Sequence, residues 1–117
     1  LWEHTCFEAF VRGAGEGYRE SNFSPSTQWA AYDFDGYRAN MRPADIASPH
    51  IHILAGAERF DLQTMIDLGD AATHRLALSA VIEETSGAKS YWALAHPPGK
   101  PDFHREVGFV CELNAAM

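Results

Sequence analysis

The sequence has few positive charges, few cysteines and no long apolar run, and each shortage excludes a class of protein. Nine Lys and Arg stand against 16 Asp and Glu, so the formal net charge is −7 at pH 7. Nucleic acids and anionic lipids are held mainly by clustered cations, so neither is an expected partner. No segment approaches the roughly 18 apolar residues of a membrane span. The sequence shows no positively charged segment followed by an apolar segment, which is the pattern of an export signal, so we expect a cytoplasmic chain.

The length of 117 residues fits a single core, and we expect residues 1–117 to form one domain. The two cysteines, Cys6 and Cys111, fall in apolar segments near opposite ends. Their spacing permits a disulfide but does not require one, and we expect two buried free thiols. Because the chain begins in the middle of an apolar segment at Leu1, we also expect that preceding sequence is missing.

Alternating apolar and polar residues between turns rich in Gly, Pro, Ser and Asp predict about eight short strands. The expected strands are residues 1–11, 18–23, 29–38, 50–54, 59–68, 76–84, 91–95 and 109–113. By composition 76–84 would also suit a helix, but the Ser86-Gly87 hairpin signal behind it favours a strand. We therefore predict an all-β fold, an antiparallel β-sandwich of the jelly-roll type with little helix.

A stiff loop is predicted within residues 90–104, SYWALAHPPGKPDFH. Pro97, Pro98 and Pro101 fix φ and lack an N–H, so this segment cannot continue as a helix or central strand. The segment displays Trp92, His96, Lys100, Asp102 and His104. A loop that is ordered in advance loses less entropy when a ligand binds, so we predict a binding site here. The alternative is a structural loop that seals one end of the sandwich.

Three segments carry a family resemblance: WEHTCFEAF at 2–10, NFSPSTQWAAYDFDGYR at 22–38, and SYWALAHPPGKPDFH at 90–104. Together they resemble the bacterial DOMON-like proteins related to family 9 carbohydrate-binding modules. The resemblance implies a β-sandwich that binds a sugar or haem, often without catalysis. Such proteins usually carry further strands before the segment that matches 2–10, and a glycine often stands where this chain has Thr27. Strand edges left open by missing strands favour association, so we predict a homodimer or larger assembly.

Saccharide binding needs a flat aromatic face for the C–H side of the ring and polar side chains for the hydroxyls. The residues we assign to ligand binding are Trp29, Arg38, Trp92, His96, Lys100, Asp102 and His104. Further candidate platforms are Tyr32, Tyr37 and Tyr91. Each of these aromatics could instead pack in the core.

A small glycoside hydrolase on the same fold is the alternative function, because a pair of carboxyl groups can cleave a glycosidic bond. The candidate catalytic acids are Glu8, Asp35 and Asp102. Glu8 alternates onto a strand face with Cys6 and Phe10, where loss of solvent would raise its pKa. The alternative for Glu8 is an ion pair with Arg19 or Arg38.

No cofactor is predicted, although two weaker patterns exist. His50 and His52 share a strand face and could hold zinc or copper only with a third ligand, such as His74 or His104. Haem would need Met41 or Met65 together with a histidine. Neither pattern is complete in the sequence, so no metal ligand is assigned. The expected partner remains a saccharide or another small ligand.

Overall fold

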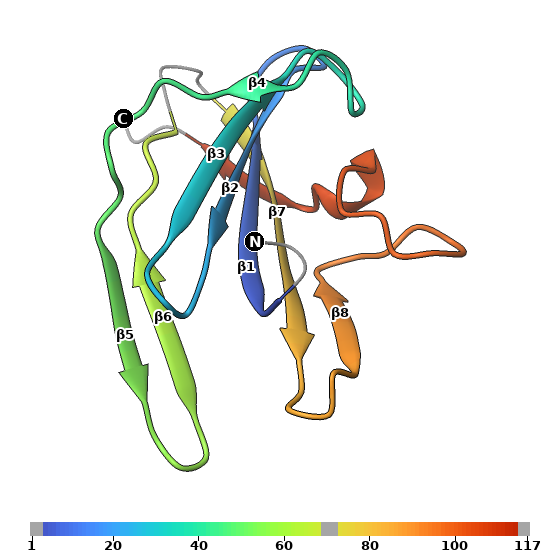
Figure 1. Cartoon of the computed structure of the whole chain (residues 1–117). Helices are drawn as coiled ribbons and strands as arrows, with labels where there is room; N and C mark the ends of the chain where they lie inside the picture. The colour runs from blue at the N-terminus through green and yellow to red at the C-terminus, as the bar shows by residue number, and fades with distance from the viewer. Residues whose placement is uncertain (1–3, 69–72, 115–117) are drawn as a thin grey trace.

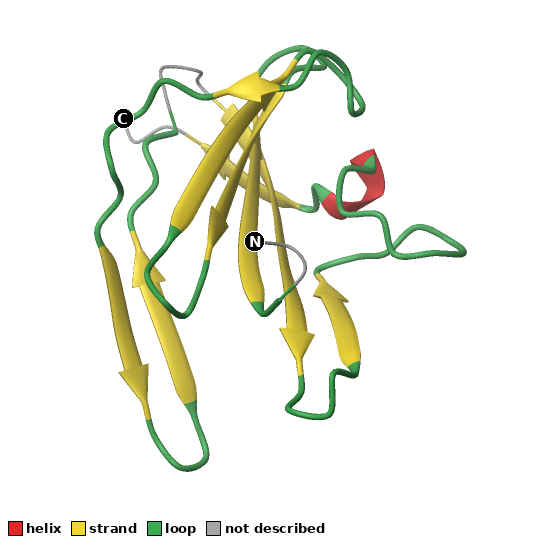
Figure 2. Cartoon of the chain, viewed as in Figure 1, coloured by secondary structure: helices red, strands yellow, loops and turns green. Residues whose placement is uncertain are grey.

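The computed structural model describes residues 4–68 and 73–114, and these residues form an all-β fold (Figure 2). The strands are β1 (Cys6–Arg12), β2 (Tyr18–Phe23), β3 (Trp29–Phe34), β4 (Arg42–Pro43), β5 (Ile51–Ala55), β6 (Phe60–Thr64), β7 (Thr73–Glu83), β8 (Lys89–Ala93) and β9 (Cys111–Asn114). A single 3-10 turn, η1 (Glu106–Gly108), is the only helical element in this part of the chain. The predicted all-β class with little helix is confirmed.

The strands form two antiparallel sheets (Figure 1). The larger sheet has seven strands in the order β4-β3-β2-β1-β7-β8, and β9 also pairs with β7. The smaller sheet is the hairpin β5–β6, which lies to one side of the larger sheet in Figure 1. The rings of Phe7 and Phe60 stack at 5.9 Å between centroids, and this contact attaches the hairpin to the larger sheet. The result is the predicted antiparallel sandwich.

Strand register sorts the side chains of the larger sheet onto two faces, because directly paired residues point the same way. Phe10 is paired with Glu20 and with Ala77, and Glu8 with Asn22 and with Ser79. We call this side the core face. The opposite side, which carries Phe7, Phe23 and Trp29 and faces the β5–β6 hairpin, is called the hairpin face.

The main hydrophobic cluster covers the core face and consists of Phe10, Tyr18, Phe34, Ala77 and Phe109. Phe109 comes from residues 94–110 between β8 and β9, which we call the closing segment. Its ring packs edge-on against Phe10 and Tyr18, with centroid distances of 6.2 and 5.7 Å. The closing segment therefore lies across the core face and supplies a second wall above the sheet.

Several predicted boundaries differ from the observed ones. The strand predicted at 29–38 ends at Phe34, because Asp35 donates its N–H to the carbonyl of Ala39 and begins a turn. Arg42–Pro43 pairs with β3 as a short strand outside the eight that we predicted. The strand predicted at 59–68 is limited to Phe60–Thr64. The strands predicted at 76–84, 91–95 and 109–113 are displaced by a few residues, and residues 1–3 of the first predicted strand lie outside the described residues.

The cysteines are both free, as predicted, but only Cys6 is buried, and Cys111 is half-buried. Burial, reinforced by the charge of Glu8, raises the pKa of the Cys6 thiol to about 12. Because the thiolate is the reactive form, Cys6 is a packing residue and not a nucleophile.

Thr27 occupies a strained backbone conformation in the turn between β2 and β3. Its φ is 72°, in the left-handed region where a Cβ is unfavourable, and its N–H is held by the carbonyl of Ser24. We expect Thr27→Gly to raise the free energy of unfolding by about 0.5–1 kcal/mol, because the relieved strain exceeds the added freedom of the unfolded chain. Urea unfolding of both proteins measures this difference, and a destabilised variant would contradict it.

Candidate functional site

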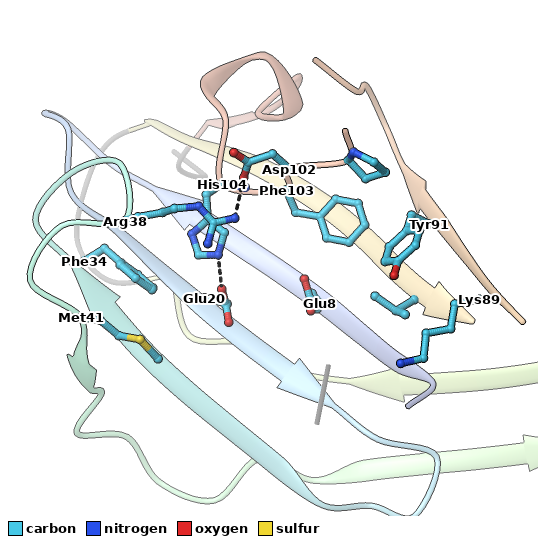
Figure 3. Close-up of a pocket in the computed structure, with 12 residues that line it drawn as sticks. Glu8, Glu20, Phe34, Arg38, Met41, Lys89, Tyr91, Asp102, Phe103 and His104 are labelled. Atoms are coloured by element: carbon cyan, nitrogen blue, oxygen red, sulfur yellow. Dashed lines mark hydrogen bonds and ion pairs between the residues drawn. The ribbon is translucent and has the colours of Figure 1, made fainter. Parts of the chain in front are cut away.

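A pocket of about 530 Å³ lies between the core face and the closing segment (Figure 3). Its lining residues are Glu8, Glu20, Phe34, Arg38, Met41, Val81, Lys89, Tyr91, Pro101, Asp102, Phe103 and His104. The volume falls in the range of small-molecule sites, about 300–1,000 Å³. The floor comes from β1, β2, β3, β7 and β8 of the larger sheet, and the wall across it comes from the closing segment.

A chain of hydrogen bonds crosses the pocket floor. Glu20 accepts a bond from Asn22 Nδ2 at 2.8 Å through Oε2, and its Oε1 lies 3.0 Å from His104 Nε2. His104 Nδ1 lies 2.7 Å from the Tyr18 hydroxyl, which accepts the N–H of Arg38 at 3.1 Å. With its proton on Nε2, the His104 ring donates to Glu20 and accepts from the Tyr18 hydroxyl at Nδ1, whereas the buried Oδ1 of Asn22 has no hydrogen-bond partner among the described residues. The chain fixes the position of the Glu20 carboxylate.

Glu8 is the second carboxyl group of the floor, and it is only 8 % exposed. Burial, and then the nearby charge of Glu20, raises its pKa to about 7, although a hydrogen bond from Ser79 Oγ at 3.2 Å acts in the opposite direction. The predicted desolvation of Glu8 is confirmed. The alternative ion pair is wrong, because Arg19 is bound to Asp33 and Arg38 to Asp102.

The two carboxyl groups belong to neighbouring strands. Glu8 is paired with Asn22, and Phe10 is paired with Glu20, so Glu8 and Glu20 are diagonal neighbours on one face. Diagonal pairs have Cα atoms about 7–8 Å apart, within reach of one small ligand. The floor therefore presents a carboxyl group with a raised pKa beside a carboxylate that is held in place.

Asp102 fastens the closing segment to the turn after β3. It accepts hydrogen bonds from the Tyr37 hydroxyl and from Arg38 Nη2, the latter at 2.9 Å, and Arg105 Nε approaches at 3.5 Å. Burial alone would raise the pKa of Asp102, but the hydrogen bonds from Tyr37 and Arg38 prevail and lower it. The guanidinium of Arg105 also lies 4.9 Å from the centre of the Tyr37 ring. Asp102 thus acts as the anchor of the pocket wall.

The structure brings together four of the residues assigned from sequence, namely Glu8, Arg38, Asp102 and His104. The other five lie elsewhere: Trp29, Asp35, Trp92, His96 and Lys100. Asp35 is exposed and bound by Asn40 and Arg42. His96 and Lys100 belong to the closing segment without lining the pocket.

The aromatic neighbours Tyr91 and Trp92 show how β8 divides the two faces. Tyr91 is paired with Val81 and lines the pocket, whereas Trp92 is paired with Ala80 and points to the hairpin face. Trp92 is 63 % exposed there, and its indole N–H is bound to Ser90 Oγ at 2.9 Å. Trp29 lines a second pocket, also on the hairpin face.

Sequence reasoning missed Glu20, Lys89 and Phe103 as pocket residues. A signal for Glu20 exists, since Tyr18, Glu20 and Asn22 alternate on one side of a strand that a hairpin turn joins to β1. Pairing these two strands places Glu20 beside Phe10. Phe103 has no such signal, because its position depends on how the closing segment folds back over the sheet.

The three-ligand pattern for zinc or copper is not assembled in the residues that the structure describes, whereas the methionine and histidine pattern for haem stays a prediction, with Met41 and His104 lining the same pocket. No three His, Cys, Asp or Glu side chains gather there into a group able to hold a metal ion. His74 is buried on β7, while His52 is exposed on β5. In the same ranges no helix is long and apolar enough to cross a membrane.

Comparison with known proteins yields no match: no family model, no curated protein and no solved structure matches this chain. The resemblance to DOMON-like proteins and family 9 modules therefore stays a prediction.

Proposed function

We propose that the chain is a saccharide-binding module whose site is the pocket on the core face, in keeping with its resemblance to DOMON-like and family 9 modules. The observation that supports this best is the division of the lining. Aromatic rings of Tyr91 and Phe103 stand on one side, and carboxyl groups of Glu8 and Glu20 stand on the other (Figure 3). A pyranose has the same division between its C–H face and its hydroxyl groups.

The polar groups of the pocket suit hydroxyl ligands. A hydroxyl both donates and accepts, and the lining offers Glu20 as an acceptor and Arg38 and Lys89 as donors. Glu8 changes from donor to acceptor as it ionises near pH 7. Tyr91 and Phe103 form a tilted pair with centroids 6.4 Å apart, and together they provide an apolar wall.

The test compares two adjacent aromatic residues of β8 that point to opposite faces. Saturation-transfer NMR with a mixture of mono- and oligosaccharides should detect binding to the parent chain. We expect Tyr91→Ala to weaken saccharide binding by about ten-fold, because the loss of an aromatic contact with the ligand costs about 1 kcal/mol or more of binding free energy. Trp92→Ala is the matched control and should bind like the parent.

Both side chains are largely exposed, at 46 % and 63 %, so neither truncation empties the core. Absence of saturation transfer to any sugar would refute the proposal. Equal losses in the two variants would show that the sugar binds outside this pocket.

Glycoside hydrolysis is the second candidate, favoured by the raised pKa of Glu8 beside the carboxylate of Glu20. The Glu8 carboxyl proton would pass to the glycosidic oxygen as the bond from that oxygen to the anomeric carbon breaks. Glu20 would either bond to the anomeric carbon or take a proton from the attacking water. In the same samples, turnover of aryl glycosides would appear as product signals, lost in Glu8→Gln and Glu20→Gln but kept in Asp35→Asn.

The predicted self-association is also a proposal. Three apolar side chains on the hairpin face of β7 and β8 are exposed, namely Leu78, Trp92 and the adjoining Leu94. Exposed apolar groups beside an edge strand favour association of copies. Light scattering after size exclusion reports the assembly directly.

A further inference from the structure

The second pocket lies on the hairpin face, on the other side of the sheet from the proposed saccharide site. Its volume is about 580 Å³, and the two pockets share no lining residue. Its walls come from β2, β3 and the two segments that flank the β5–β6 hairpin, residues 45–50 and 65–67. A ligand here would be independent of a ligand in the first pocket.

One side of this pocket is apolar and aromatic. Phe23 and Trp29 end the β2–β3 pair, where they are directly opposite each other, and Ile46 and Ile66 come from the flanking segments. Phe23 is buried, whereas Trp29 and the two isoleucines are partly exposed towards the pocket. Among aromatic side chains, indole binds cations most strongly through its ring face.

Acidic side chains outnumber basic ones in the lining of this pocket. Arg19 is the only Lys or Arg among its lining residues, and two hydrogen bonds of 2.7 and 3.1 Å bind its guanidinium to Asp33. Asp45 and Asp67 also line the pocket. The hydrogen bond to Asp33 raises the pKa of Arg19, and the nearby charges of Asp67 and Asp45 act in the same direction. A cation is therefore favoured over an anion.

The hydroxyl of a mostly buried serine also faces this pocket. Ser21 is 4 % exposed and lines the pocket from β2, and its hydroxyl has no hydrogen-bond partner among the described residues. This hydroxyl is not one of the fully enclosed unpaired atoms of the described residues, so it opens into the pocket, where a polar group of a ligand can take the place of water on it. Ser21 is thus a second feature, separate from the acids, that points to a ligand.

We propose that this second pocket binds an organic cation, in which a compact ammonium group is attached to an apolar body. The apolar body would rest against Trp29 and Phe23. The ammonium group would lie towards Asp45 and donate a hydrogen bond to the Ser21 hydroxyl. This assignment does not depend on the saccharide site, which lies on the opposite face.

The test uses 2-phenylethylammonium and its uncharged analogue 2-phenylethanol as probes. Proton–nitrogen NMR spectra follow the indole N–H of Trp29, which is assigned by its loss in Trp29→Phe. We expect 2-phenylethylammonium to shift this signal, and 2-phenylethanol to bind at least about ten-fold more weakly. Asp45→Asn should weaken the cation by about ten-fold, and Ser21→Ala should weaken it by several-fold.

Glu84→Gln is the matched control, because it removes the same charge from an exposed turn between β7 and β8 and should leave the affinity unchanged. Asp45 is exposed, so its replacement does not threaten folding. The proposal is overturned if the Trp29 signal does not move at about 10 mM cation. It is also overturned if the two probes bind equally, or if Glu84→Gln weakens binding as much as Asp45→Asn does.

Discussion

Replacing Glu8 with glutamine should make the protein more stable at pH 8 by on the order of 3 kcal/mol, with little change at pH 4. The Glu8 pKa is about 7 in the folded protein, against an ordinary value of 4.5. Between these two values the folded state binds more protons than the unfolded state, so the stability of the parent falls as pH rises through this window. Above pH 7 both states are ionised and the loss is complete. Glutamine stays neutral and avoids it.

Urea unfolding at unit steps from pH 4 to pH 8 measures this difference. A control is Glu84→Gln, an exposed position where the same change should leave the pH dependence of the parent intact. A Glu8→Gln protein whose stability still declines between pH 5 and pH 7, in parallel with the parent, would mean that Glu8 is solvated and ionised. The acid–base role considered for it in glycoside hydrolysis would then lose its physical basis.

Phe10→Ala should lower the free energy of unfolding by about 3–5 kcal/mol, because a fully buried phenyl ring is removed. Phe10 is 0 % exposed, and its ring packs against Tyr18, His104 and Phe109. The loss also loosens His104, so the chemical shifts of the imidazole should change in the variant. Chemical denaturation and histidine NMR measure the two effects.

The milder variant Phe10→Leu covers the case in which Phe10→Ala does not fold, and it should cost about 1–1.5 kcal/mol. Met65→Ala is the surface control, since Met65 is 88 % exposed and should change stability by less than about 0.5 kcal/mol. A Phe10→Ala protein as stable as the Met65→Ala protein would contradict the packing described for the core face.

The fold class follows from local patterns in the sequence. Alternation over 18–23 and 29–34 and the glycine-rich turn at 13–17 are sufficient to predict three neighbouring antiparallel strands. Alternation also predicts that Glu8 lies on the same side of its strand as Phe10. It therefore predicts the loss of solvent around the Glu8 carboxyl group. Alternation does not reveal the register between two strands, and only this register makes Glu8 and Glu20 neighbours.

The remainder of the site depends on contacts distant in sequence. The sequence led us to assign Trp92 to ligand binding and to give Tyr91 only as a further candidate, but the pairing of β8 with β7 places Tyr91 in the pocket and Trp92 on the hairpin face. The sequence predicts that Asp102 is a ligand-binding residue in an exposed loop. In the structure its carboxylate accepts hydrogen bonds from Tyr37 and Arg38, and these bonds hold the pocket wall in place. Local pattern cannot show which partner a polar side chain will find 64 residues away.

The anchor between Asp102 and the turn after β3 has a consequence for synthesis. The pocket floor belongs to strands of the larger sheet that precede residue 94, whereas the wall is added by residues 101–104. During translation the sheet residues emerge first, and the two floor carboxyl groups remain open to water until residues 101–104 have left the ribosome. A nascent chain stalled before Asp102 should therefore have no enclosed ligand site, because the residues that cover the floor carboxyl groups have not yet been added.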